Sequence, residues 1–140
     1  MKRLNDYMPA TEMTIKDKGE LASIIIQLLD TWEVSSSDQI ILLSLPEKTP
    51  TRAIRKYRQC TPFPENDVLN EKLDHIVGIA EALRTTYPRN ANMGPQWMNK
   101  PHKRFGGRSA LRVMLDDGIK GFITVRAQLD CAFAWENYDK

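Results

Sequence analysis

The sequence has few of the residues that build reactive or metal-binding centres. Among its 140 residues are two cysteines and two histidines. Cys60 and Cys131 lie far apart and form no CxxC pair, so neither a zinc site nor a redox motif is predicted, and no cofactor is expected. We expect two reduced thiols that fill small apolar spaces. His75 and His102 lack a nucleophile or an HExxH context, and we expect a helix-face residue and a solvated loop residue.

Long apolar runs are also lacking. No segment approaches the roughly 20 apolar residues that cross a bilayer. Residues 1–20 carry lysines and acids but no apolar centre like that of a secretory signal. The sequence therefore predicts a cytoplasmic protein of one domain, or of two very small ones.

The net charge of +2 excludes little by itself, but the basic residues are unevenly distributed. Local basic clusters on a nearly neutral chain favour a surface for an anionic partner. One cluster comprises Arg52, Arg55, Lys56 and Arg58, and the other comprises Lys100, Lys103, Arg104, Arg108 and Arg112.

The first half of the chain predicts three helices behind an arm at residues 1–18, which lacks sustained periodicity. The ranges are 19–32, 36–45 and 50–59. Serines open the second helix and Pro46 ends it, while Thr49 as N-cap and Pro50 as first residue open the third. The face predicted to be buried in the first helix comprises Leu21, Ile24, Ile25, Leu28, Leu29 and Trp32, with Ile26 as an extra apolar residue.

The second half predicts one long helix and then a helix pair. The long helix spans about 67–86, after a stiff linker with two prolines, and Gly78 within it would permit close packing. A segment around Trp97 leads to the glycine pair Gly106–Gly107, where the backbone can turn sharply. Ser109 suits an N-cap and Gly118 a helix end, before a last helix from about residue 119. No segment alternates as a strand would, so the predicted fold class is all-α.

Residues 36–59 resemble the helix pair of a helix-turn-helix domain. In that motif the front of the second helix reaches base edges, and other cations contact phosphates. The DNA-binding candidates are Thr49, Thr51, Arg52, Arg55, Lys56 and Arg58. The turn LSLPEKT is longer than usual, and a three-helix bundle with a solvated basic face is the alternative. Because few basic contacts give weak affinity, useful binding would need a dimer or a partner.

Large aromatic side chains are candidate interface anchors, since they carry much interface energy. These are Trp97, Phe105, Trp135 and Tyr138. For Trp97 the alternative is local core packing, whereas the last two lie near the chain end, where exposure is expected. The glycine pair could also form a phosphate cradle, but neither GxGxxG nor Walker A spacing accompanies it.

The C-terminal half carries a spaced pattern of aromatic, apolar, glycine and serine residues. They are Trp97-Met98, Pro101, Phe105-Gly106-Gly107, Ser109, Leu111, Met114-Leu115, Gly118, Gly121, Val125 and Leu129. This pattern resembles W-L…P-N…L-G-G-x-(S/T)-P-L-x-L-L…G…V…L, which is typical of the Xre/MbcA/ParS family of bacterial antitoxins. Ala110 stands in place of the family's proline and His102 in place of its asparagine.

The resemblance implies an antitoxin of a type II toxin–antitoxin system. Such proteins cover the active-site cleft of a cognate toxin, commonly a RES-type toxin that consumes NAD or a related ADP-ribosyltransferase. Many also repress their own operon through the helix-turn-helix part. The implied division is an arm at 1–18, a helix-turn-helix domain at 19–86 and a toxin-binding domain at 87–140. We expect a homodimer or a hetero-oligomer with the toxin.

Charge adds basic candidates to the aromatic ones at the toxin surface, because cations suit an acidic or phosphate-binding cleft. The basic candidates are Lys103, Arg104, Arg108, Arg112 and Arg126. The alternative function is a stand-alone transcription regulator whose C-terminal part dimerises. An enzyme is not expected, because Asp116-Asp117 is best interpreted as a solvated helix end, without a nucleophile or metal set beside it.

Overall fold

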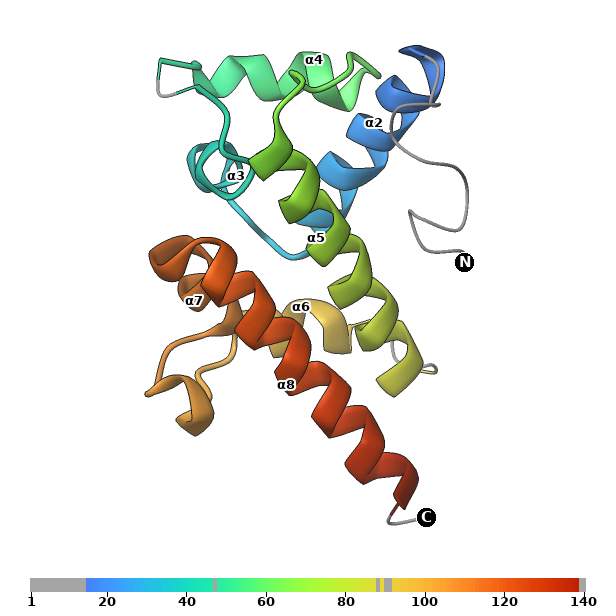
Figure 1. Cartoon of the computed structure of the whole chain (residues 1–140), viewed down its shortest axis with the longest axis vertical. Helices are drawn as coiled ribbons and strands as arrows, with labels where there is room; N and C mark the ends of the chain where they lie inside the picture. The colour runs from blue at the N-terminus through green and yellow to red at the C-terminus, as the bar shows by residue number, and fades with distance from the viewer. Residues whose placement is uncertain (1–14, 47, 88, 90–91, 139–140) are drawn as a thin grey trace. The chain divides into compact units, whose positions relative to one another are not determined.

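The computed structural model describes residues 15–46, 48–87, 89 and 92–138, and the side chains of these residues up to Asp130. Within these ranges the chain forms helices and turns, which confirms the all-α fold (Figure 1). The strand-like pairing in the described part is one isolated antiparallel bridge, between Pro101 and Ser109. No described helix combines the length and the apolar character needed to cross a membrane.

The chain divides into two compact units, Met1–Asp74 and His75–Lys140. The division falls inside helix α5 (Asp67–Thr86), so this helix contributes its first turns to one unit and the rest to the other. Its bounds agree with the predicted helix, and Asn66 caps it by accepting from the backbone N–H groups of Val68 and Leu69. The predicted domain boundary between residues 86 and 87 lies at the end of α5, whereas the division into compact units falls after Asp74.

The first unit contains α2 (Ile15–Thr31), α3 (Ser36–Leu42), the 3₁₀ turn η2 (Thr51–Ala53) and α4 (Ile54–Arg58). Since α2 starts at Ile15, residues 15–18 of the predicted arm are helical; residues 1–14 lie outside the described ranges. Helix α3 ends before the predicted residue 45, because Ser44 adopts a left-handed backbone with φ +53°.

The third predicted helix is shorter and begins differently. It opens as the 3₁₀ turn η2, with Pro50 in extended backbone as its N-cap residue and no side-chain cap bond, so Thr49 is not the cap. Its end lies close to α2. A Cβ on Gly19 would overlap the backbone carbonyl of Cys60, which itself has φ +70°. The Cys60 side chain is exposed, which corrects its expected role as a buried filler.

The buried face of α2 differs from the predicted one. Ile24 is 52% exposed, whereas Ile26 is fully buried. Ala22, Ile25, Ile26 and Leu29 share the inward face, at the i, i+3, i+4, i+7 spacing of a helix. Because three isoleucines are consecutive, the apolar pattern of α2 fits two different helix faces. The packing of α2 against α4 determines which of the two faces is buried.

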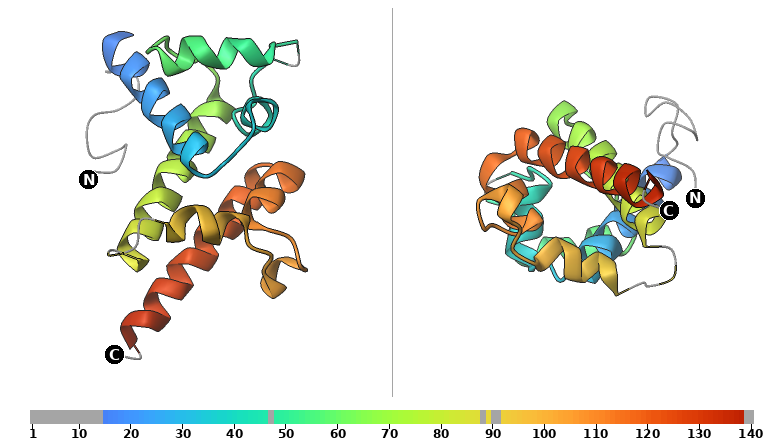
Figure 2. Two further views of the ribbon diagram at one scale, coloured as in Figure 1. Left: turned by 180° about the vertical axis from the view of Figure 1, so that it is seen from behind. Right: turned by 90° about the horizontal axis from the view of Figure 1, so that it is seen from below.

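The second unit contains α6 (Met93–Asn99), the 3₁₀ turn η3 (Lys103–Phe105), α7 (Ala110–Asp117) and α8 (Ile119–Tyr138) (Figure 2). Helices α7 and α8 pack against each other, and α6 packs against α7. Both predicted signals of this region are confirmed. Ser109 caps α7 by accepting from the Arg112 backbone N–H at 3.0 Å, and Gly118 ends it with φ +63°.

A missing side chain allows α7 and α8 to approach closely. A Cβ on Gly121 would overlap the backbone carbonyl of Val113. Phe122, Val125 and Leu129 of α8 are fully buried. This helix pair is the base from which the preceding loop extends.

Candidate functional site

The most distinctive surface feature is the α6–α7 loop, residues 100–109. Its two ends are held together by the Pro101–Ser109 bridge and by the His102 N–H, which donates to the Arg108 carbonyl at 3.1 Å. Inside this closure the Gly107 N–H donates to the His102 carbonyl at 3.0 Å. The loop is therefore closed by hydrogen bonds of its own backbone.

The glycine pair is required by backbone conformation, not by space. Gly106 and Gly107 have φ +67° and +85°, and a Cβ on either would meet no atom within 4 Å. Their N–H groups are used inside the loop, because Gly106 donates to Lys103 and Gly107 to His102. Since a phosphate cradle needs free amide groups, the loop does not form one here.

Three rings pack against one another at the loop, those of Trp97, His102 and Phe105. The ring centroid of His102 lies 4.7 Å from that of Trp97 and 5.4 Å from that of Phe105. The His102 Nε2–H also donates to the Trp97 carbonyl at 2.9 Å. His102 is half-buried, which corrects its expected role as a solvated loop residue. The 3₁₀ turn η3 folds Phe105 back into this cluster, and no sequence periodicity indicates that return.

Two predicted anchors are thus part of the loop's support. Trp97 is 8% exposed and Phe105 is 5% exposed, and their rings meet edge to face at 6.3 Å. This is the local packing that was the alternative for Trp97. The other two aromatic candidates, Trp135 and Tyr138, lie on α8 where the described side chains have ended.

Arg108 and Arg112 form ion pairs with the end of α7. Arg108 Nη2 lies 3.2 Å from Asp117 Oδ2, and its Nη1 lies 3.6 Å from Asp116 Oδ2. The hydrogen bond with Asp117 raises the pKa of Arg108 above its ordinary value. Arg112 Nη2 lies 2.9 Å from Asp116 Oδ1. The two aspartates are exposed, as expected of a solvated helix end, but they also neutralise two predicted toxin contacts.

Arg126 contacts two residues of α5 that belong to its own unit. Its guanidinium lies against Gly78 of α5, where a Cβ would overlap it, which agrees with the close packing expected at this glycine. Its Nη1 lies 3.3 Å from His75 Nδ1. The half-buried Arg126 therefore joins α8 to α5, a partner that charge pattern alone did not reveal.

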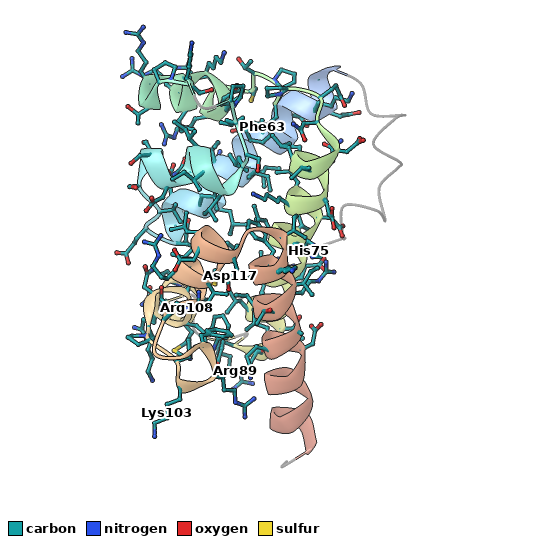
Figure 3. The ribbon with its side chains drawn as sticks, turned by 60° about the vertical axis from the view of Figure 1, so that its left-hand side comes forward. Phe63, His75, Arg89, Lys103, Arg108 and Asp117 are labelled. Carbon is teal, nitrogen blue, oxygen red and sulfur yellow. The ribbon has the colours of Figure 1, made fainter. Side chains whose placement is uncertain are left out.

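Three cations of the second cluster remain directed to solvent. Lys100, Lys103 and Arg104 are exposed, and none of them forms an ion pair with any described residue. Figure 3 shows Lys103 extending outward from the loop, whereas Arg108 lies beside Asp117. Among the described residues, the cluster therefore comprises two arginines in ion pairs and three exposed cations that form none.

The basic cluster of the first unit divides in a similar way. Arg52, Arg55 and Lys56 are exposed, as is Thr51, and Thr49 is half-buried in the segment before them. Lys56 Nζ lies 5.2 Å from the ring centroid of Tyr57. Arg58, predicted to contact phosphate, is instead paired with Asp30 of α2.

The described side chains include no group of three or more His, Cys, Asp or Glu residues that could hold a metal ion. The α6–α7 loop combines a backbone closed by hydrogen bonds with exposed cations.

Comparison with known proteins finds a relative of this chain. No family model matches the chain, and no solved structure matches it. The chain is 31% identical over 104 residues to "Uncharacterized protein y4oB" of Sinorhizobium fredii (strain NBRC 101917 / NGR234). The match covers 74% of this chain and 77% of that protein. The chain therefore belongs to the same family as y4oB.

Proposed function

We propose that the protein is an antitoxin, a binding protein and not an enzyme, which blocks a cognate protein toxin through its C-terminal region, residues 87–140. The toxin would be of the NAD-consuming RES type or a related ADP-ribosyltransferase. The observation that carries the proposal is the α6–α7 loop, which is closed at its base, supported by three rings and exposes cations.

A preformed loop suits inhibition of a partner protein. A loop that already has its bound conformation loses little conformational entropy on association, so more of the contact energy appears as affinity. The hydrogen bonds from His102 and Gly107 provide this rigidity. Arg104 offers a planar group that pairs well with carboxylates, and Lys103 adds a flexible charge.

The residues that carry the resemblance to the antitoxin family have structural roles consistent with the proposal. Trp97 and Phe105 support the loop, and Ser109 caps the helix that follows it. Gly121 allows the close approach of α7 and α8. The residues of the shared pattern therefore stabilise one structural arrangement, in which the α6–α7 loop precedes the packed helices α7 and α8.

Operon repression through DNA is the second part of the proposal, and a stand-alone regulator is its alternative. The observation that favours DNA is the exposed row of Arg52, Arg55 and Lys56 along η2 and α4. With about three phosphate contacts the affinity would be low and strongly dependent on salt. A dimer or a toxin complex would raise it by bringing two such rows to one site.

Growth rescue tests the proposal. The full chain is co-expressed with the product of the adjoining reading frame, and growth and cellular NAD are followed. An antitoxin restores both when the neighbouring product alone stops growth and depletes NAD. A neighbouring product that is harmless alone, or one whose toxicity persists in the presence of this chain, would refute the proposal.

A further inference from the structure

We propose that Lys103 and Arg104, the loop-tip cations, dock the protein onto an acidic surface of its partner protein, while Arg108 and Arg112 act as positioning residues. The inference rests on the proposed function and names the residues and the surface chemistry of the contact. Lys100, the exposed first residue of the loop, would add to the positive potential of the loop.

The division of labour follows from the ion pairs. Arg108 and Arg112 already face Asp116 and Asp117 at 2.9–3.6 Å, so a partner would have to break those pairs to use them. Arg108 Nε also donates to the Phe105 carbonyl at 3.2 Å, which holds the loop beside α7. The loop-tip cations pair with no carboxylate in the described part of the chain.

A protein surface is favoured over a nucleic acid by what the loop does not offer. Trp97 and Phe105 are buried, so the loop presents neither ring as a platform for stacking bases. The amide groups of Gly106 and Gly107 are occupied and cannot bind phosphate. Two or three cations alone contact too few phosphates for useful affinity, whereas they suffice to steer a protein partner.

The test measures association of the full chain with the product of the adjoining reading frame. The variant is Lys103→Glu/Arg104→Glu. The matched control is Lys120→Glu/Arg84→Glu, which reverses one exposed lysine and one exposed arginine of the same unit. Thermal unfolding of both variants checks that the fold is kept.

We expect the loop variant to associate about 10-fold more slowly at low salt, and the control to resemble the unaltered chain. The difference should shrink at about 0.5 M salt, where the Debye length falls to a few ångströms. Equal association of the loop variant and the unaltered chain would overturn the inference while leaving the proposed function standing.

Two other outcomes also decide the question. If the unaltered chain does not bind the neighbouring product, the proposed function fails and the inference fails with it. A DNA duplex of about 20 base pairs serves as a second probe. If the loop variant loses duplex binding but keeps protein binding, the loop-tip cations serve nucleic acid and the inference is overturned.

Discussion

Arg58 of α4 and Asp30 of α2 form a two-point ion pair, in which Nε and Nη2 donate to the two carboxylate oxygens at 3.1 Å each. Asp30 Oδ1 also accepts from Gln39 Nε2 of α3 at 2.8 Å. Asp30 thus joins three helices of the first unit. The pair fixes how α4 is held, and it removes Arg58 from the exposed basic row.

This ion pair predicts that two neighbouring arginines affect different properties of the protein, one its stability and the other its DNA binding. Arg58→Ala should lower the free energy of unfolding by about 1 kcal/mol, because a partly exposed two-point pair is lost. Arg55→Ala should leave stability unchanged but weaken any DNA binding, since Arg55 is exposed. Urea unfolding and duplex binding measure the two effects. A larger loss of stability for Arg55→Ala than for Arg58→Ala would contradict this assignment.

The α6–α7 loop predicts a purely conformational effect at Gly106. Gly106→Ala should lower the free energy of unfolding by about 1 kcal/mol, because φ +67° disfavours a side chain although space is available. Gly106→Asn should lose less, since asparagine tolerates left-handed backbone. The comparison is made by denaturant unfolding. If asparagine proved as harmful as alanine, crowding and not backbone conformation would be the cause.

The contact between α7 and α8 predicts a steric effect at Gly121. Gly121→Ala should lower the free energy of unfolding by about 2 kcal/mol, because the new methyl group meets the Val113 backbone carbonyl, which cannot rotate away. Lys120→Ala is the control, one residue earlier and exposed. Calorimetry of both variants tests this, and a stability of Gly121→Ala equal to that of the control would exclude the close contact.

Lys72 predicts a dependence of stability on pH. It is 7% exposed, its Nζ donates to Ser44 Oγ at 2.6 Å, and burial lowers its pKa from the ordinary value of 10.5. Between the lowered pKa and 10.5 the unfolded chain binds more protons than the folded one. Stability contributed by this group should therefore rise with pH across that window.

Lys72→Met should remove this rise, because it keeps an apolar stem without a titrating group. Lys16→Met, at an exposed lysine of the same unit, is the control. The measurement is denaturant unfolding at several alkaline pH values. Parallel profiles for the unaltered chain and Lys72→Met would show that Lys72 does not contribute.

Local signals in the sequence predicted much of the fold. Residues close to each feature determine the caps at Ser109 and Gly118 and the bounds of α5. The sequence alone was therefore enough to predict these features. The buried face of α2 did not follow, because Ile24 and Ile26 are equally apolar and tertiary packing chooses between them.

The candidate site was only partly predictable for the same reason. The basic cluster at residues 100–112 was visible. Arg112 lies four residues before Asp116, a helical spacing that indicates their ion pair, but no such spacing indicates the partner of Arg108. Arg108 precedes α7 and meets Asp117 at the other end of that helix, and Arg126 meets His75 at a separation of 51 residues in the chain. Such pairs depend on tertiary structure and leave no periodic trace in the sequence.

Direct formation of a complex tests whether this chain binds a toxin. The purified full chain is mixed with the product of the adjoining reading frame and separated by size-exclusion chromatography with light scattering. We predict one peak with the summed mass of both proteins and loss of the partner's NAD consumption in that peak. Two separate peaks with undiminished NAD consumption would contradict it.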